Sequence, residues 1–207
     1  MNDVDFRNRV KGAITQTLIK ALLEDAGYRV IPLGVEEIIR EVKNLSMEEY
    51  IELGLSKKLR SLPDFLITDY SFQKSWLVEV KYRKRWNKSV KQDLGQQIRE
   101  QVKIWQPLYL VVFLGSSVDP RNDTPANRIG AIKLVSSNNH LCCCSRRKRK
   151  FFSKEFEEYN MPWEEITWKN FRRIQDIFPN LSERWEDSTL IQSLEILKAL
   201  EELDLFE

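Results

Sequence analysis

The segment SLPDFLITDYSFQKSWLVEVKYRKRW, residues 61–86, carries ionisable side chains within apolar runs. Asp64 follows a proline at the start of the first run, and Glu79 and Lys81 lie two residues apart in the second. Side chains two apart in a strand share a face. Glu79 and Lys81 are therefore expected to point the same way, while Val80 between them faces a core.

β-Branched and aromatic residues in the two runs predict two strands, residues 65–68 and 76–82. We expect an antiparallel hairpin in which Phe65 lies opposite Val78. The same register sets the two carboxylates of the segment opposite each other, and directly opposed residues have Cβ atoms about 4.5–5.5 Å apart. The spacing therefore predicts one site that contains both carboxylates and the lysine.

Two carboxylates at this distance repel each other, and burying them is costly unless a cation lies between them. Oxygen ligands favour a hard ion, so Mg²⁺ is the expected metal. Lys81 would orient a water molecule, lower its pKa or stabilise charge on a phosphate oxygen. Such a site suits attack of water on a phosphodiester. The alternative is a surface hairpin with an ordinary Glu–Lys pair.

The residues Pro63-Asp64 and Glu79-Val80-Lys81 resemble the signature of the PD-(D/E)XK nuclease superfamily. This group includes restriction endonucleases, archaeal Holliday-junction resolvases and RecB-type nucleases. The similarity extends over roughly residues 6–135, with a helix and a Gly-Tyr strand before the motif and a helix and a buried strand after it.

The resemblance implies an α/β fold with a restriction-endonuclease-like core, a central mixed β-sheet flanked by helices. It also implies that Asp64 and Glu79 are catalytic metal ligands, that the Val80 carbonyl is a further ligand, and that Lys81 is the catalytic lysine. The implied cofactor is Mg²⁺, with Mn²⁺ as a substitute.

Members of the superfamily often carry a glutamate on the first helix, where this chain has Gln16. An amide can hydrogen-bond a metal-bound water but is a poorer ligand than a carboxylate, which leaves open whether one or two metals bind. Glu24, Glu36 and Glu37 are alternatives for the missing carboxylate.

Gln101-Val-Lys-Ile-Trp105 is similar to the Q-x-x-x-Y pattern on the helix after the motif in RecB-like nucleases. Gln101 and Trp105 would share a helix face. Gln101 is expected to contact a DNA strand or the surroundings of Lys81, whereas Trp105 is expected in the core.

Cations continue directly after the motif and would line a groove for phosphate groups, with Trp86 available for stacking on a base or sugar. These candidate nucleic-acid-binding residues are Arg83, Lys84, Arg85, Lys88 and Lys91. A solvated loop is the alternative. A second basic run, residues 146–150, is either a phosphate contact or an exposed loop.

The expected function is that of a metal-dependent (deoxyribo)nuclease, a hydrolase acting on nucleic acid and most simply on DNA. The alternative is a nucleic-acid-binding protein on the same fold with weak or no catalysis, which Gln16 motivates. Tryptophans near the C-terminus also suggest a protein-interaction surface, and family analogy allows a homodimer.

Composition limits the other classes. The 207 residues are 42% hydrophobic and 31% charged, with a net charge of +2, so a packed core is expected. His140, the single histidine, cannot supply a histidine pair, and no P-loop or G-x-G-x-x-G motif is present.

Cys142–Cys144 are adjacent and suit neither a disulfide framework nor a zinc site. No apolar run reaches about 18 residues, and the N-terminus is charged, so we expect a cytoplasmic chain without a membrane partner.

The pattern along the chain predicts a nuclease-like core over residues 1–150 and a helical C-terminal extension over residues 151–207, packed on or near that core. The sequence predicts helices at residues 6–26, 35–43, 89–105 and 189–203, and a capping box at Ser46 that opens a helix toward Leu59. Further strands are expected at residues 28–33, 108–114, 129–135 and 140–144.

Overall fold

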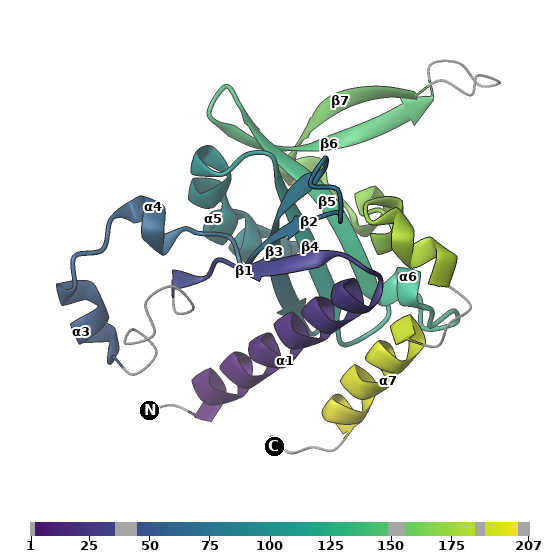
Figure 1. The fold of residues 1–207 in the computed structure, drawn as a ribbon, viewed down its shortest axis with the longest axis horizontal. Coiled ribbons are helices and arrows are strands. Elements are labelled where there is room, and N and C mark those ends of the chain that lie inside the picture. The colour runs from purple at the N-terminus through teal and green to yellow at the C-terminus, as the bar shows by residue number, and fades with distance from the viewer. Residues whose placement is uncertain (1–2, 36–44, 149–155, 185–188, 203–207) are drawn as a thin grey trace.

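The computed structural model describes residues 3–35, 45–148, 156–184 and 189–202 (Figure 1). Its helices are α1 (Asp3–Asp25), α3 (Met47–Glu52), α4 (Lys57–Arg60), α5 (Lys88–Ile104), α6 (Pro125–Arg128) and α7 (Thr189–Glu202). Its strands are β1 (Arg29–Pro32), β2 (Phe65–Thr68), β3 (Ser75–Arg83), β4 (Leu108–Leu114), β5 (Ile129–Ser137), β6 (His140–Lys148) and β7 (Phe156–Pro162). Short 3-10 helices occupy Trp163–Glu165, Trp168–Asn170, Ile174–Asp176 and Pro179–Arg184.

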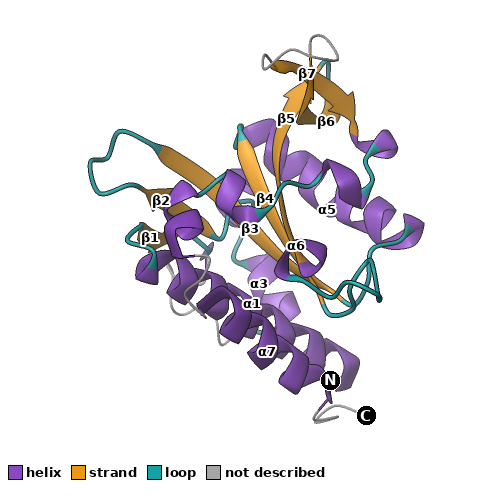
Figure 2. Cartoon of the chain, turned by 90° about the vertical axis from the view of Figure 1, so that its right-hand side faces the viewer, coloured by secondary structure: helices purple, strands orange, loops and turns teal. Residues whose placement is uncertain are grey.

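The seven strands form one mixed sheet with helices on both faces (Figures 1 and 2). Spatial order follows chain order from β1 to β7, and β3 and β4 run parallel while the other neighbours are antiparallel. The predicted α/β class with a flanked mixed sheet is confirmed, and the described sheet has seven strands.

The central strand β4 is apolar throughout because both of its faces are covered. Val111 and Phe113 lie in the core under α1, whereas Leu110 and Val112 lie in the core under α5. Because β3 is the parallel neighbour of β4, α5 serves as the crossover helix between the two strands. The part of β3 that carries Glu79 is therefore held in place by its neighbouring strands and by α5.

The hairpin of β2 and β3 has the predicted register, with Phe65 paired to Val78. Its loop is held by the Asp69 carboxylate, which accepts hydrogen bonds from the Gln73 and Lys74 backbone N–H groups at 2.9 and 3.2 Å. These local hydrogen bonds fix the loop geometry.

Helix α1 ends as its sequence predicts. Gly27 follows the helix with φ of 85°, a left-handed conformation that glycine adopts without strain. Ile19, Leu22 and Leu23 pack α1 against the sheet, and the spacing of these residues matches one helix face. Gln16 lies toward the N-terminal end of this helix face, and its side chain points toward the start of β2.

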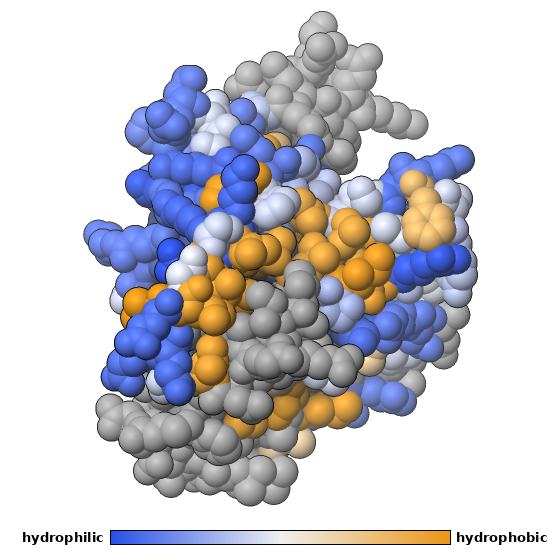
Figure 3. All heavy atoms as spheres, turned by 60° about the vertical axis from the view of Figure 1, so that its left-hand side comes forward, coloured by the Kyte–Doolittle hydropathy of each residue, from blue (hydrophilic) through white to orange (hydrophobic). Residues whose placement is uncertain are grey.

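The described residues between β1 and β2 include two short helices. The capping box at Ser46 is confirmed, but α3 ends at Glu52 rather than continuing toward Leu59, because Gly54 takes a φ of 62° and Ser56 caps a new helix, α4. Lys57 Nζ binds Glu100 Oε2 of α5 at 2.5 Å. Figure 3 turns this side of the molecule forward and shows apolar residues gathered at its centre among hydrophilic ones. The helix predicted at residues 35–43 lies almost wholly outside the described residues.

The C-terminal stretch belongs to the same packed unit as the residues before it. Its described part begins with β7, which pairs with β6, and continues through 3-10 helices rather than the helices expected there. Trp163 and Phe178 are buried in the two cores. Trp163 lies against Gly95 of α5, where an added Cβ would come within 2.3 Å of the indole nitrogen.

Several smaller predictions also have outcomes. His140 is exposed, and the thiols of Cys142–Cys144 form no disulfide. Among the described residues, no helix is long and apolar enough to cross a membrane. Asp187 and Ser188, which by residue type and position could cap α7, fall outside the described residues.

Candidate active site

Asp64 lies at the start of β2 and is held in place by two donors. Val80 donates its backbone N–H to Asp64 Oδ2 at 2.7 Å, and Gln16 Nε2 donates to Asp64 Oδ1 at 2.8 Å. The first hydrogen bond follows from the hairpin register, and the second joins α1 to the sheet. Leu33 donates its backbone N–H to the Asp64 carbonyl at 2.9 Å, which fixes the main chain as well.

Glu79 is 5% exposed and is bound by two side chains. Lys81 Nζ lies 2.5 Å from Glu79 Oε1, and Gln101 Nε2 donates to Glu79 Oε2 at 2.7 Å. Gln101 also reaches the Leu62 carbonyl at 3.3 Å, so α5 is linked to the chain just before Asp64. The structure therefore brings Gln16, Asp64, Glu79, Lys81 and Gln101 into one cluster.

The two carboxylates of this cluster affect the pKa values of its ionisable side chains. Burial, and then the nearby charge of Glu79, raise the pKa of Asp64 to about 7, although Lys81, Val80 and Gln16 oppose the shift. Burial alone would lower the pKa of Lys81, but the charges of Glu79 and Asp64 outweigh it and raise that pKa. The ionised form of Asp64 is therefore costly, and a cation between the two carboxylates would relieve that cost.

The oxygen atoms of this cluster are of the kind that a hard divalent cation prefers as ligands. Asp64 and Glu79 provide carboxylate oxygens, and the Val80 carbonyl lies between Glu79 and Lys81 in the chain. Within the described part of the chain, no three or more His, Cys, Asp or Glu side chains gather in a cluster. Of the described residues, these two would supply the carboxylate ligands, and Gln16 would provide a neutral oxygen after rotation of its amide.

The alternative glutamates give no third carboxylate among the described residues. Glu24 is exposed on α1 and lies 3.9 Å from Lys20, while Glu36 and Glu37 fall outside the described residues. Trp105 is half-buried, and its indole N–H is buried without a partner in the described structure.

The predicted basic residues separate into three groups. Arg83 donates to Gln97 Oε1 at 2.9 Å and lines a recess beside Lys81 together with Lys84. Lys91 donates to the Glu164 and Ile166 carbonyls at 2.5 and 3.2 Å, so its ammonium group binds protein carbonyls rather than facing a phosphate group. Arg85 and Lys88 are exposed.

Trp86 packs among other aromatic rings instead of standing free for stacking. Its ring centroid lies 5.0 Å from that of Phe171 and 5.8 Å from that of Trp168. The basic run at 146–150 contributes residues 146–148 to β6, and residues 149–150 lie outside the described residues.

Three recesses meet at the cluster, and we name them by the elements beside them. The α1 recess, of about 260 Å³, is lined by Gln16, Lys20 and Asp64. The β3 recess, of about 590 Å³, includes Lys11, Gln16 and Lys81. The α4–α5 recess, of about 300 Å³, includes Arg60, Asp64, Glu79, Lys81 and Gln101. Each pair of recesses shares a residue of the cluster; Asp64 lines the α1 and α4–α5 recesses, Glu79 lines the α4–α5 recess, and the β3 recess meets the cluster at Gln16 and Lys81.

Sequence reasoning missed the cations Lys11, Lys20 and Arg60 that line these recesses. Lys20 lies four residues after Gln16 on α1, so helix periodicity could have placed it beside the site. Arg60 carried no comparable signal, because its position depends on a short helix that the sequence pattern did not predict.

Comparisons of the chain with protein-family models, with curated proteins and with solved structures give no match. The resemblance to PD-(D/E)XK nucleases therefore stays a prediction from the motif residues. Any functional assignment depends on the chemistry of the cluster itself.

Proposed function

We propose that the chain is a metal-dependent nuclease that hydrolyses phosphodiester bonds, with DNA as the expected substrate. The observation that carries the proposal is the convergence of two carboxylates and a lysine at the junction of three recesses, with Asp64 costly to ionise in the absence of a cation. The restriction-endonuclease-like core belongs to the same proposal.

The protein groups have separate roles in this proposal. Asp64 and Glu79, with the Val80 carbonyl, would hold Mg²⁺ or Mn²⁺, which when bound supplies positive charge and an activated water. Gln101 and Lys81 hold the Glu79 carboxylate in position through its two oxygens. Lys81 lines both the β3 and the α4–α5 recess, where its ammonium group can stabilise negative charge on a phosphate oxygen.

Gln16 holds Asp64 by its amide N–H. The orientation of an amide follows from its hydrogen-bond partners, so its oxygen can turn toward a cation or a bound water once the Asp64 charge is neutralised. One metal is the simplest stoichiometry, because two carboxylates provide few ligands for a second.

A second candidate is a nucleic-acid-binding protein without catalysis. The observation in its favour is that all four carboxylate oxygens of Asp64 and Glu79 already accept hydrogen bonds or an ion pair from the protein. In this case the chain binds nucleic acid with a strong salt dependence and cuts nothing.

A cleavage panel separates the two candidates. Linear, nicked, single-stranded and branched DNA, with a matching RNA, are incubated with the protein in Mg²⁺, Mn²⁺ or EDTA. The nuclease proposal predicts products in the metal lanes alone, and it predicts that Asp64→Ala and Lys81→Ala abolish them while the circular dichroism spectrum is kept. Equal products from wild type and both variants would refute the assignment of the site.

A further inference from the structure

Arg60 is the last residue of α4 and lines the same recess as the two carboxylates. The chain between Arg60 and Asp64 is short and anchored, because Gln101 binds the Leu62 carbonyl and Pro63 is buried. Lys57 ties the start of α4 to Glu100 of α5. Contacts on both sides of Arg60 therefore anchor the main chain that carries it beside the cluster.

No hydrogen bond or ion pair of the Arg60 side chain is present within the described residues, although Glu100 lines the same recess. The Glu100 carboxylate is already neutralised, because Lys57 binds one of its oxygens and Lys103 binds the other at 2.8 Å. These contacts with Lys103 and Lys57 lower the pKa of Glu100 to about 2, so it stays ionised and paired with them. Among the described residues, Arg60 is therefore left as a cation without a partner.

The other cation of this recess, Lys81, is paired with Glu79. An anion in the α4–α5 recess therefore has the Arg60 guanidinium available as a cation that no described residue neutralises. A guanidinium presents several donors in a fixed fork that matches two oxygens of a phosphate. The recess also opens onto Asp64, where the bond to be cut would lie under the proposed function.

We propose that Arg60 binds a phosphate of the nucleic-acid strand next to the phosphodiester that is cut, in the recess between α4 and α5. This inference rests on the proposed function and adds a substrate contact in a different recess from the one lined by Arg83 and Lys84. The strand would then run past the carboxylates from the α4–α5 recess into the β3 recess.

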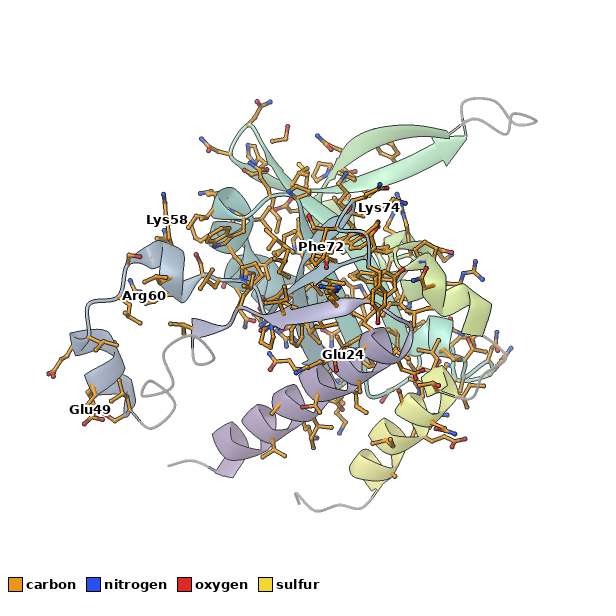
Figure 4. All side chains as sticks on the ribbon, in the orientation of Figure 1. Glu24, Glu49, Lys58, Arg60, Phe72 and Lys74 are labelled. Atoms are coloured by element: carbon orange, nitrogen blue, oxygen red, sulfur yellow. The ribbon has the colours of Figure 1, made fainter. Side chains whose placement is uncertain are left out.

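Lys58 provides a matched control. It is a cation on the same short helix, two residues from Arg60, and it is not among the residues that line the recess. Residues two apart on a helix do not face the same way, and Figure 4 labels both side chains on α4. A general effect of positive charge on α4 would appear equally in Lys58→Gln and Arg60→Gln.

The test measures binding of labelled single-stranded and duplex DNA by fluorescence anisotropy in EDTA, over a series of salt concentrations, with a parallel cleavage assay in Mg²⁺. Arg60→Gln is expected to weaken binding about tenfold and to lower the slope of log affinity against log salt by about one. Arg60→Lys should recover part of the loss, and Lys58→Gln should stay near wild type.

The outcomes separate this inference from the proposed function. If wild type cuts DNA and Arg60→Gln binds and cuts as Lys58→Gln does, Arg60 is no phosphate contact and the nuclease proposal stands. If wild type binds without cutting, the nuclease proposal fails while the binding arm still decides the role of Arg60. If wild type neither binds nor cuts, both fail.

Discussion

Replacing Asp64 by asparagine should make the metal-free protein more stable at neutral and alkaline pH. Burial and Glu79 raise the pKa of Asp64 from 3.8 to about 7 in the folded chain. The folded state therefore favours the protonated form, and stability present at acid pH is lost as pH rises through that range. Asparagine removes the charge and can keep both hydrogen bonds, accepting from Val80 and donating to Gln16 once that amide turns.

The magnitude follows from the shift. At about 1.4 kcal/mol per pKa unit, a rise from 3.8 to about 7 corresponds to roughly 4 kcal/mol above neutral pH. We expect Asp64→Asn to gain about 2–4 kcal/mol at pH 8 and close to nothing below pH 4. For a chain of this length, each kcal/mol corresponds to about 2–4 °C in the unfolding midpoint.

The assay is thermal and urea unfolding in EDTA at several pH values, with wild type, Asp64→Asn and Asp69→Asn. Asp69 provides the control with opposite sign. Burial opposes ionisation there, but backbone donors at Lys74 and Gln73 and the Ser71 hydroxyl outweigh it and lower the Asp69 pKa. Asp69→Asn should therefore lose stability above pH 4. A variant Asp64→Asn that is less stable than wild type at pH 8, with no pH-dependent difference between them, would refute the electrostatic reasoning.

Three further predictions concern the parts that position the site. Gln101→Leu should cost about 1–3 kcal/mol in urea unfolding, because it removes a donor from buried Glu79; an unchanged midpoint would contradict the role given to this amide. Gly95→Ala should cost about 1–3 kcal/mol by displacing Trp163, whereas Gly12→Ala, where an added Cβ meets nothing within 4 Å, should gain up to about 1 kcal/mol; equal effects in the two variants would argue against the Trp163 contact. A chain cut near Ser153 should show broad, non-cooperative unfolding by near-ultraviolet circular dichroism, because it lacks β7 and the buried Trp163 and Phe178; a sharp transition would mean that the first part folds alone.

Local geometry made the central part of the site predictable from sequence. Strand alternation placed Glu79 and Lys81 on one face, and loop length set the register of Phe65 with Val78. Gln101 is expected beside Lys81 or at a DNA strand. Its hydrogen bond to Glu79, the carboxylate that also pairs with Lys81, agrees with the first of these.

Contacts between distant segments were harder to predict. The hydrogen bond of Gln16 to Asp64 joins residues 48 positions apart, and no local pattern indicates that these two side chains meet. Lys91 appeared in the same basic run as Arg83, yet its ammonium group binds carbonyls more than 70 residues away. Charge patterns cannot separate a cation that binds the protein from one that faces a ligand.

The C-terminal stretch shows the same limit for apolar residues. Its tryptophans and phenylalanines suggested helices, but Trp163 packs over the sheet from a short 3-10 helix, and Phe178 does so from the bend between two others. Aromatic residues signal burial, while the backbone that presents them depends on the shape of the surface that they cover.

The most direct test of the central claim is metal-dependent cleavage of labelled DNA by wild type and Asp64→Asn, each shown to be folded at the assay temperature. We predict that wild type gives products that rise with Mg²⁺ concentration, and that Asp64→Asn, although the more stable protein in EDTA, gives none. Products from Asp64→Asn at the wild-type rate would contradict a catalytic metal site at Asp64 and Glu79.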